Sequence, residues 1–135
     1  MNRIWNKKGE GYIDTCVMVV VFVMILVVAI NIFSFITLKV DMDEIADELI
    51  ETAAFTGEFG DNFRKRNEEL QAMYFYYDVD YHAEKYFNSA LERVQLGDTM
   101  TVTIIIDTYI KGLGIFKIPV TLQVTKTQIS EKYWK

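Results

Sequence analysis

The sequence predicts an α+β protein. We expect a long N-terminal helix, transmembrane in its first half and amphipathic in its second, packed on a small antiparallel β-sheet. Three observations predict this fold: an uncharged apolar run over 15–37, helical spacing of apolar residues beyond it, and two alternating segments around a glycine-containing turn. The expected divisions are a cytoplasmic basic tail (1–9), a transmembrane helix (10–37), an amphipathic extension (38–57) and an extracytoplasmic sheet domain (58–135).

The apolar run has the length of a membrane span. At 1.5 Å per residue, the segment 15–37 forms a helix of roughly 35 Å, which crosses a hydrocarbon core of ~30 Å. A helix is expected because lipid leaves no partner for unpaired backbone groups. The alternative, a removable secretory signal, has a shorter apolar region of about 7–15 residues and a small-x-small cleavage site, which is missing here.

Charges on either side of the run predict its orientation. Arg3, Lys7 and Lys8 precede it, whereas after the single Lys39 the flank is acidic, with Asp41, Asp43, Glu44, Asp47 and Glu48. Positively charged flanks stay in the cytoplasm. We therefore expect a single-pass protein of the cell membrane, with the N-terminus cytoplasmic and the C-terminal domain extracytoplasmic.

The helical pattern continues beyond the run. Apolar residues recur at spacings of three and four, at Leu38, Met42, Ile45, Ala46, Leu49, Ile50 and Ala53. The first glycine after them is Gly57. We therefore expect one helix from about 12 to 55, whose second half carries an apolar stripe covered by the sheet.

The middle of the chain predicts a short helix, a strand and a connection. Segment 61–72 reads as a surface helix with Asp61 as N-cap and local ion pairs between Arg64-Lys65-Arg66 and Glu68-Glu69. Segment 73–82 alternates, with Met73, Phe75, Tyr77, Val79 and Tyr81 on one face and Tyr74, Tyr76, Asp78, Asp80 and His82 on the other. Segment 83–96 is either a short helix or an irregular connection, and we expect the latter with some helical turn.

The last third predicts a long antiparallel hairpin of 99–110 and 115–127, joined by a turn at 111–114. Its expected inward residues are Met100, Val102, Ile104 and Ile106, followed by Phe116, Ile118, Val120, Leu122 and Val124. Pro119 cannot donate a hydrogen bond to a ladder. It therefore indicates an edge strand or a bulge.

Composition argues against several functions. The formal net charge is -5 and no basic patch follows the span, so we expect no nucleic-acid partner. The single cysteine, Cys16, lies in the span, which leaves the outer domain without a disulfide framework. With His82 as the one histidine, no catalytic constellation can be assembled. Asp78 and Asp80 are either a weak divalent-cation site or strand-solubilising charges, and we favour the latter. We expect no enzyme, cofactor or metal.

Polar residues of the anchor are the candidate functional residues. Asp14 opens the apolar run, where an unpaired charge is costly. It is either an inter-subunit charge partner or an interfacial carboxylate suited to the positive end of the helix dipole. Asn31 and Ser34 lie deeper in the run and are candidates for hydrogen bonds to another helix.

The segment 7–14, KKGEGYID, resembles the N-terminus of type IV pilin-like proteins, notably the minor pseudopilins of tight-adherence systems. In those families a prepilin peptidase cuts after a leader glycine, and an acidic residue stands fifth in the mature chain. The resemblance implies a processing site between Gly9 and Glu10, with Asp14 as the charge partner of an adjacent subunit's new terminus. The chain departs from the pattern in carrying Asp instead of Glu at the fifth position and Glu10 instead of an apolar or small first residue.

A second resemblance extends over most of the chain. The motifs GEGYIDT, VQL, TVTI, IPVTL and SEKYWK resemble an uncharacterised family of small membrane proteins from Firmicutes, whose members tend to be encoded on integrative and conjugative elements. This resemblance implies a Gram-positive surface or transfer apparatus.

Together these patterns predict a non-enzymatic, pseudopilin-like structural subunit of a pilus-like, secretion or conjugative-transfer apparatus. Its expected partners are the membrane, other pilin-like or transfer-apparatus subunits including copies of itself, and a prepilin peptidase. The alternative is an uncleaved single-span protein whose outer domain binds a transfer-channel or cell-wall component. The partner surface would then comprise Tyr74, Tyr76, Asp78 and Asp80.

Overall fold

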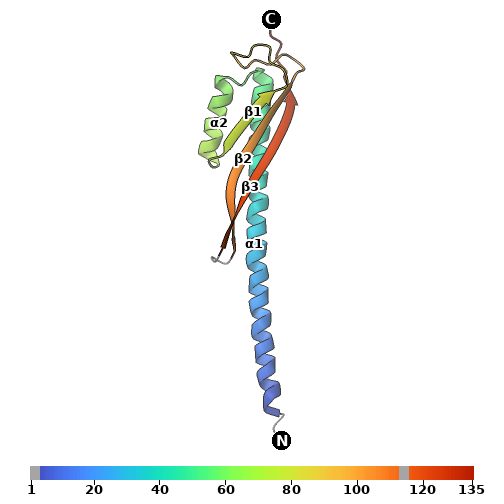
Figure 1. Ribbon diagram of the computed structural model, residues 1–135, viewed down its shortest axis with the longest axis vertical. Helices are drawn as coiled ribbons and strands as arrows, with labels where there is room; N and C mark the ends of the chain where they lie inside the picture. The colour runs from blue at the N-terminus through green and yellow to red at the C-terminus, as the bar shows by residue number, and fades with distance from the viewer. Residues whose placement is uncertain (1–3, 113–115) are drawn as a thin grey trace.

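The computed structural model describes residues 4–112 and 116–135. Its elements, in chain order, are α1 (Ile4–Thr56), α2 (Asp61–Met73), β1 (Asp78–Ala83), β2 (Thr99–Gly112) and β3 (Phe116–Ile129). α1 runs the length of the molecule, and the other elements gather beside its C-terminal half (Figure 1). The predicted α+β architecture, a long helix with a small antiparallel sheet, is confirmed.

α1 is one helix of 53 residues. It begins at Ile4, earlier than the predicted start near residue 12, because Gly9 and Gly11 lower helix propensity without interrupting the hydrogen-bonded ladder as a proline would. The part from Gly11 to Thr56 contains an 18-residue window with a mean hydropathy of 3.2, none of it buried. α1 therefore supplies a candidate single membrane span.

The core lies between the C-terminal half of α1 and the inner face of the sheet. The predicted stripe of α1 is buried, as Met42, Ile45, Ala46, Leu49, Ile50 and Ala53. From the sheet, Met100, Val102, Ile104 and Val124 complete the core, while Phe63 and Leu70 come from α2. Burying each large aliphatic or aromatic side chain stabilises the fold by about 1.5–3 kcal/mol. This packing fixes the sheet on one face of α1.

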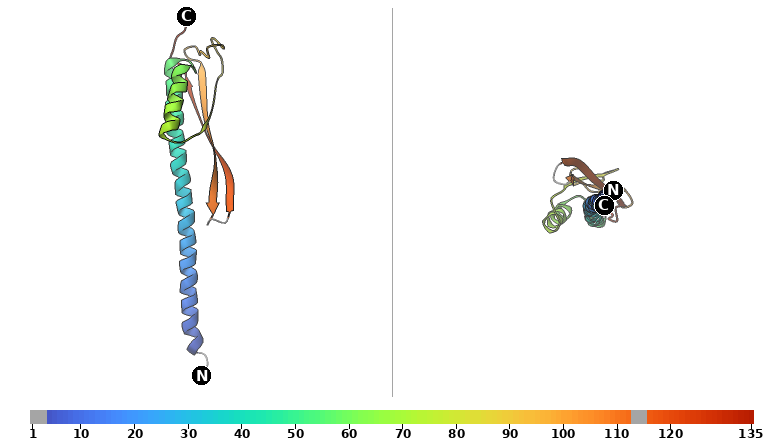
Figure 2. Two further views of the ribbon diagram at one scale, coloured as in Figure 1. Left: turned by 90° about the vertical axis from the view of Figure 1, so that its left-hand side faces the viewer. Right: turned by 90° about the horizontal axis from the view of Figure 1, so that it is seen from below.

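The sheet is antiparallel, with strand order β1-β2-β3. β1 pairs only with the Met100–Ile105 part of β2, whereas β2 and β3 remain paired from Thr99–Ile129 to Gly112–Phe116. The β2–β3 hairpin therefore continues past β1 along α1, toward the helix N-terminus (Figures 1 and 2). β3 is an edge strand, as Pro119 requires, with Pro119 opposite Tyr109.

The predicted burial of the inward-facing hairpin residues is confirmed near the core and is wrong at the far end of β3. Met100, Val102, Ile104 and Val124 are buried, and Ile106 and Leu122 pack against them. Farther along β3, Ile118 is 49% exposed, because neither β1 nor the core-forming part of α1 extends over it. The predicted turn at 111–114 is wrong in its first half, because 111 and 112 continue the ladder as part of β2, opposite 117 and 116. Residues 113 and 114 and the side chain of Phe116 lie outside the described residues.

Two expectations in the middle of the chain are wrong in part. The N-cap of α2 is Gly60, without a side-chain cap, and Asp61 is instead the first helical residue. The predicted strand at 73–82 is regular only from Asp78, because Met73 still belongs to α2 and Tyr74 donates its N–H to the Leu70 carbonyl at 2.9 Å. The segment between β1 and β2 is an irregular connection, as expected, with turns at 89–92.

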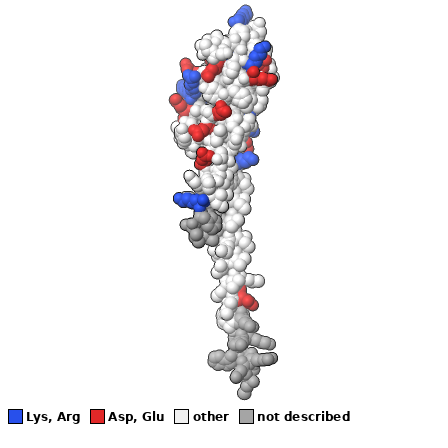
Figure 3. Space-filling view, in the orientation of Figure 1, with Lys and Arg blue, Asp and Glu red and all other residues white. Residues whose placement is uncertain are grey.

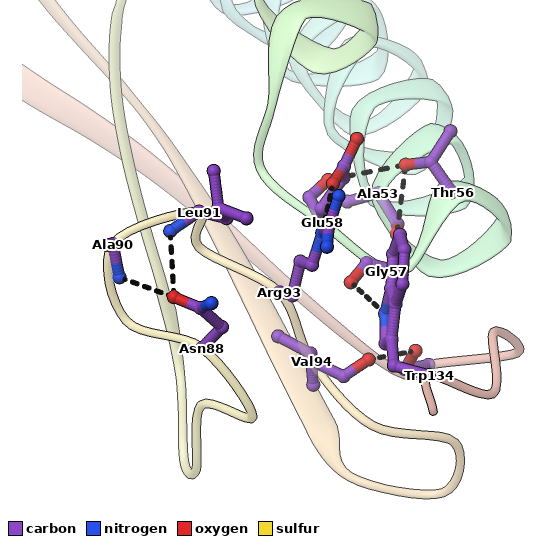
Figure 4. Close-up of polar contacts among 11 residues, drawn as sticks. Ala53, Thr56, Gly57, Glu58, Asn88, Ala90, Leu91, Arg93, Val94 and Trp134 are labelled. Carbon is purple, nitrogen blue, oxygen red and sulfur yellow. Dashed lines mark hydrogen bonds and ion pairs between the residues drawn. The ribbon is translucent and has the colours of Figure 1, made fainter.

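A cluster of contacts around Gly57 ties the end of α1 to the rest of the domain (Figure 4). The Gly57 carbonyl accepts hydrogen bonds from the Val94 N–H at 2.7 Å and from the Trp134 indole Nε1 at 3.2 Å. The Arg93 guanidinium lies 4.2 Å from the centroid of the Trp134 ring and pairs with Glu58 at 3.3 Å. Chain segments far apart in sequence are thus joined where α1 ends.

Gly57→Ala should destabilise the sheet domain more than Gly97→Ala. Both glycines have positive φ, +69° and +86°, so each substitution carries the left-handed backbone cost of about 1–2 kcal/mol. A Cβ at Gly57 would also collide with the Lys132 side chain, whereas nothing lies within 4 Å of one at Gly97. We expect the free energy of unfolding, measured in detergent by denaturant titration, to fall by about 1–3 kcal/mol more for Gly57→Ala. Equal losses would contradict this account of the Gly57 contacts.

Candidate assembly helix and outer-domain surfaces

The N-terminal half of α1 has an uncovered apolar surface. Every residue from 11 to 26 is exposed, including Tyr12, Met18 and Phe22. Charged side chains gather over the outer domain, and the helix below it is nearly uncharged (Figure 3). A surface of this size is stable only when lipid or other apolar helices cover it. Thr15 does not interrupt this surface, since it donates its hydroxyl to the Gly11 carbonyl at 2.8 Å, and Asp14 is the one charged residue between 11 and 26.

Asp14 lies on this uncovered part of α1. Its side chain is exposed, and it forms no ion pair or side-chain hydrogen bond with the side chains that the structure describes, which in α1 are those of Gly9 and of residues 11–56. Gly9 and Gly11 are also exposed, with no atom within 4 Å of the place where a Cβ would be. The bond between Gly9 and Glu10 belongs to α1. A partner for Asp14 would therefore come from outside the described part of this chain.

Asn31 and Ser34 donate their side-chain hydrogen bonds to backbone carbonyls of α1 itself. The Asn31 amide donates to the Val27 carbonyl at 2.8 Å, and the Ser34 hydroxyl donates to the Ile30 carbonyl at 3.1 Å. Both residues line a groove of about 130 Å³ with Phe35, Leu38, Thr108 and Tyr109. Within a single chain they thus face the β2–β3 hairpin, a neighbour that sequence reasoning did not foresee.

The predicted partner surface divides into exposed and packed residues. Tyr76 is 78% exposed, and Asp78 and Asp80 are exposed on β1. Tyr74 is half-buried and packs against the core. Burial raises the pKa of Tyr74, and the nearby carboxylate of Glu44 raises it further. The exposed set is therefore Tyr76, Asp78 and Asp80, without Tyr74.

A groove between α1 and its neighbours was not foreseen. It has a volume of about 430 Å³ and is lined by Glu48, Glu51, Thr52, Phe55, Thr56, Arg66, Gln128 and Glu131. Arg66 of α2 pairs with Glu69 at 3.0 Å and with Glu48 of α1, and these hydrogen bonds raise the pKa of its guanidinium. Among the described residues, no group of three or more His, Cys, Asp or Glu side chains is arranged to hold a metal ion. The pairing of Arg66 joins α2 to α1.

Comparison with known protein families assigns the chain to one of them. A family model described as a domain of unknown function (DUF4320) matches residues 17–135. The chain belongs to the DUF4320 family. The match contains the sheet domain and most of the apolar part of α1, and it begins after Gly9, Glu10 and Asp14. Searches of curated proteins and of solved structures found no match.

Within this DUF4320 domain, one tyrosine is deeply buried. Tyr77 directly precedes β1, and its hydroxyl donates to the carbonyl of Asn67 in α2 at 3.4 Å. Burial raises the pKa of Tyr77 to about 12. Because the native state favours the protonated phenol, the resulting stability is complete below about pH 10 and is lost as the pH rises toward 12.

Tyr77→Phe should therefore make the DUF4320 domain less sensitive to alkali. We expect the wild-type free energy of unfolding to fall more steeply between pH 10 and pH 12 than that of Tyr77→Phe, measured by denaturant titration in detergent. Tyr76→Phe is the matched control, because the adjacent Tyr76 is exposed and its loss should leave the wild-type slope. Identical slopes for all three proteins would refute the assignment of the alkaline loss to Tyr77.

Proposed function

We propose that this protein is a non-enzymatic, pseudopilin-like structural subunit of a pilus-like, secretion or conjugative-transfer apparatus. It is anchored in the cell membrane with its N-terminus cytoplasmic and its sheet domain extracytoplasmic. The observation that carries the proposal is α1 itself, a single 53-residue helix. Its N-terminal half is apolar and uncovered, and its C-terminal half is packed against the sheet.

Continuity of α1 supports assembly as well as anchoring. No break separates the uncovered half from the half that holds the sheet. The position of the outer domain is thus coupled to how the N-terminal half packs. Neighbouring apolar helices can replace lipid on that half without leaving backbone groups unpaired. A bundle of such helices would present the sheet domains as an ordered outer layer.

Asp14 supplies the charge that specifies this packing. Cleavage between Gly9 and Glu10 by a prepilin peptidase would create an α-ammonium group at Glu10. In an apolar bundle, pairing that group with Asp14 of the adjacent subunit satisfies two charges that would otherwise be costly to bury. Exposure of Asp14 and its lack of a partner among the described residues support this role.

Asp14→Ala should block assembly and leave membrane insertion intact. We expect roughly a tenfold loss of the protein from assemblies sheared off cells, the effect of about 1.4 kcal/mol per subunit contact. Insertion is checked by resistance of the membrane fraction to carbonate extraction. Asp14→Glu, which keeps the charge, should restore most of the assembly, and Asp61→Ala in α2 should assemble as the wild type does. Wild-type amounts of Asp14→Ala in the assemblies would count against the role.

A second function is favoured by the exposed set on the outer domain. The protein would then be an uncleaved single-span anchor that binds a transfer-channel or cell-wall component. Tyr76, 78% exposed beside Asp78 and Asp80, gives such a partner an aromatic contact with two carboxylates. Under this alternative Tyr76→Ser abolishes incorporation into the apparatus and Asp14→Ala does not, which is the reverse of the proposed pattern.

A further inference from the structure

The far end of the β2–β3 hairpin lies beside the uncharged part of α1. Thr108 and Tyr109 share their groove with Asn31, Ser34, Phe35 and Leu38. All four of these helix residues precede Lys39, the first charged residue after Asp14. The hairpin thus extends alongside a segment that the sequence assigns to the membrane, away from the core of the outer domain (Figure 2).

The length of the uncharged segment places the hairpin relative to the bilayer. A hydrocarbon core of ~30 Å takes about 20 helical residues, and the segment between Asp14 and Lys39 is only slightly longer. Wherever the core lies within it, its outer boundary falls between about residue 34 and residue 38. Tyr109 lies at the level of 31–38, and β2 continues to Gly112, roughly 10 Å farther toward the N-terminal half of α1. The end of the hairpin therefore reaches the outer boundary or passes it.

Composition of the hairpin fits an interfacial position. Tyr109 is 58% exposed and Ile118 is 49% exposed, and Pro119 is exposed as well. Tyrosine is enriched at the boundary between headgroups and hydrocarbon. No Asp or Glu occurs from residue 108 to residue 130, although the chain as a whole is acidic.

Charge at the end of the hairpin agrees with this position. Lys117 of β3 is exposed there. Anionic headgroups attract a lysine at the membrane surface. A second copy of this acidic chain would also attract it. However, the level of the hairpin along α1 favours the lipid surface, which must be there if α1 spans the membrane.

We propose that the end of the β2–β3 hairpin, formed by 108–110 and 117–119, rests in the outer headgroup layer of the membrane that α1 crosses. The inference rests on the membrane anchoring in the proposed function. It gives the sheet domain two attachments to the bilayer, the span and the hairpin. The domain is then held in one orientation about the axis of α1 before any assembly.

Site-directed spin labelling of the full chain tests this inference. The chain carries Cys16→Ser and one further substitution, Ile118→Cys or Ile129→Cys, and is placed in vesicles of phosphatidylcholine and phosphatidylglycerol. Ile129 is the matched control, since it lies at the opposite end of β3 and is 57% exposed. Accessibility of the nitroxide to oxygen and to a water-soluble nickel chelate reports its depth. We expect the ratio of oxygen to nickel accessibility to be several-fold higher at position 118 than at position 129.

Further labels separate the possible failures. A label introduced by Val21→Cys tests the span, and one introduced by Tyr109→Cys repeats the depth measurement on the neighbouring strand. If position 21 is lipid-exposed and positions 118 and 109 are as water-exposed as position 129, the hairpin inference is overturned and the anchor stands. If position 21 is water-exposed, both the membrane span proposed for α1 and the hairpin inference are refuted. Dipolar broadening at position 118 that disappears on dilution with unlabelled chain would put a second copy there and also overturn the inference.

Discussion

A single unbroken helix, α1, has an uncovered apolar surface along one part of its length and packs against a β-sheet along another. The rest of the structure follows from this. From residue 15 to residue 37 the helix carries no charged side chain, so that its surface can face lipid or other helices. In its C-terminal half the sheet buries a stripe of apolar residues, and the acidic residues from Asp41 to Glu51 lie outside that stripe. A change of pattern along a continuous helix therefore determines where the domain begins.

The sheet domain follows from the need to cover that stripe. β2 and β3 supply its inner surface, α2 closes one side through Phe63 and Leu70, and the contacts at Gly57 hold the end of α1. Lys126 of β3 lies 3.4 Å from Asp47 and 3.8 Å from Asp43, so the acidic side of α1 also meets the sheet. Such partly exposed pairs contribute little stability, and apolar burial is the main stabilising term. Because the domain is packed on α1, a shift or rotation of the uncovered half would carry the sheet domain with it.

Long periodic segments could be predicted from the sequence, and short or tertiary features could not. The stripe of α1 and the alternation of β2 and β3 continue over many residues, which separates a helical period from a strand period. The aromatic run before Asp78 is too short for this. In the structure α2 ends at Met73, and Tyr77 is buried with its hydroxyl bonded to Asn67 of α2, so the regular strand begins only at Asp78. Asp14 stands out because a charge opens an apolar run. Two features join residues that are distant in sequence: the pairing of Arg66 with Glu48, and the groove at Asn31. No local sequence pattern predicts such features.

We propose that α1 is processed and then assembles as a pilin-like helix, and the intact mass of the protein extracted from its native membrane tests this. We expect a chain that has lost residues 1–9 and begins at Glu10, with Asp14 as its fifth residue. A full-length mass, in a host shown to process other prepilins, would rule out processing and leave an uncleaved membrane anchor with the same fold.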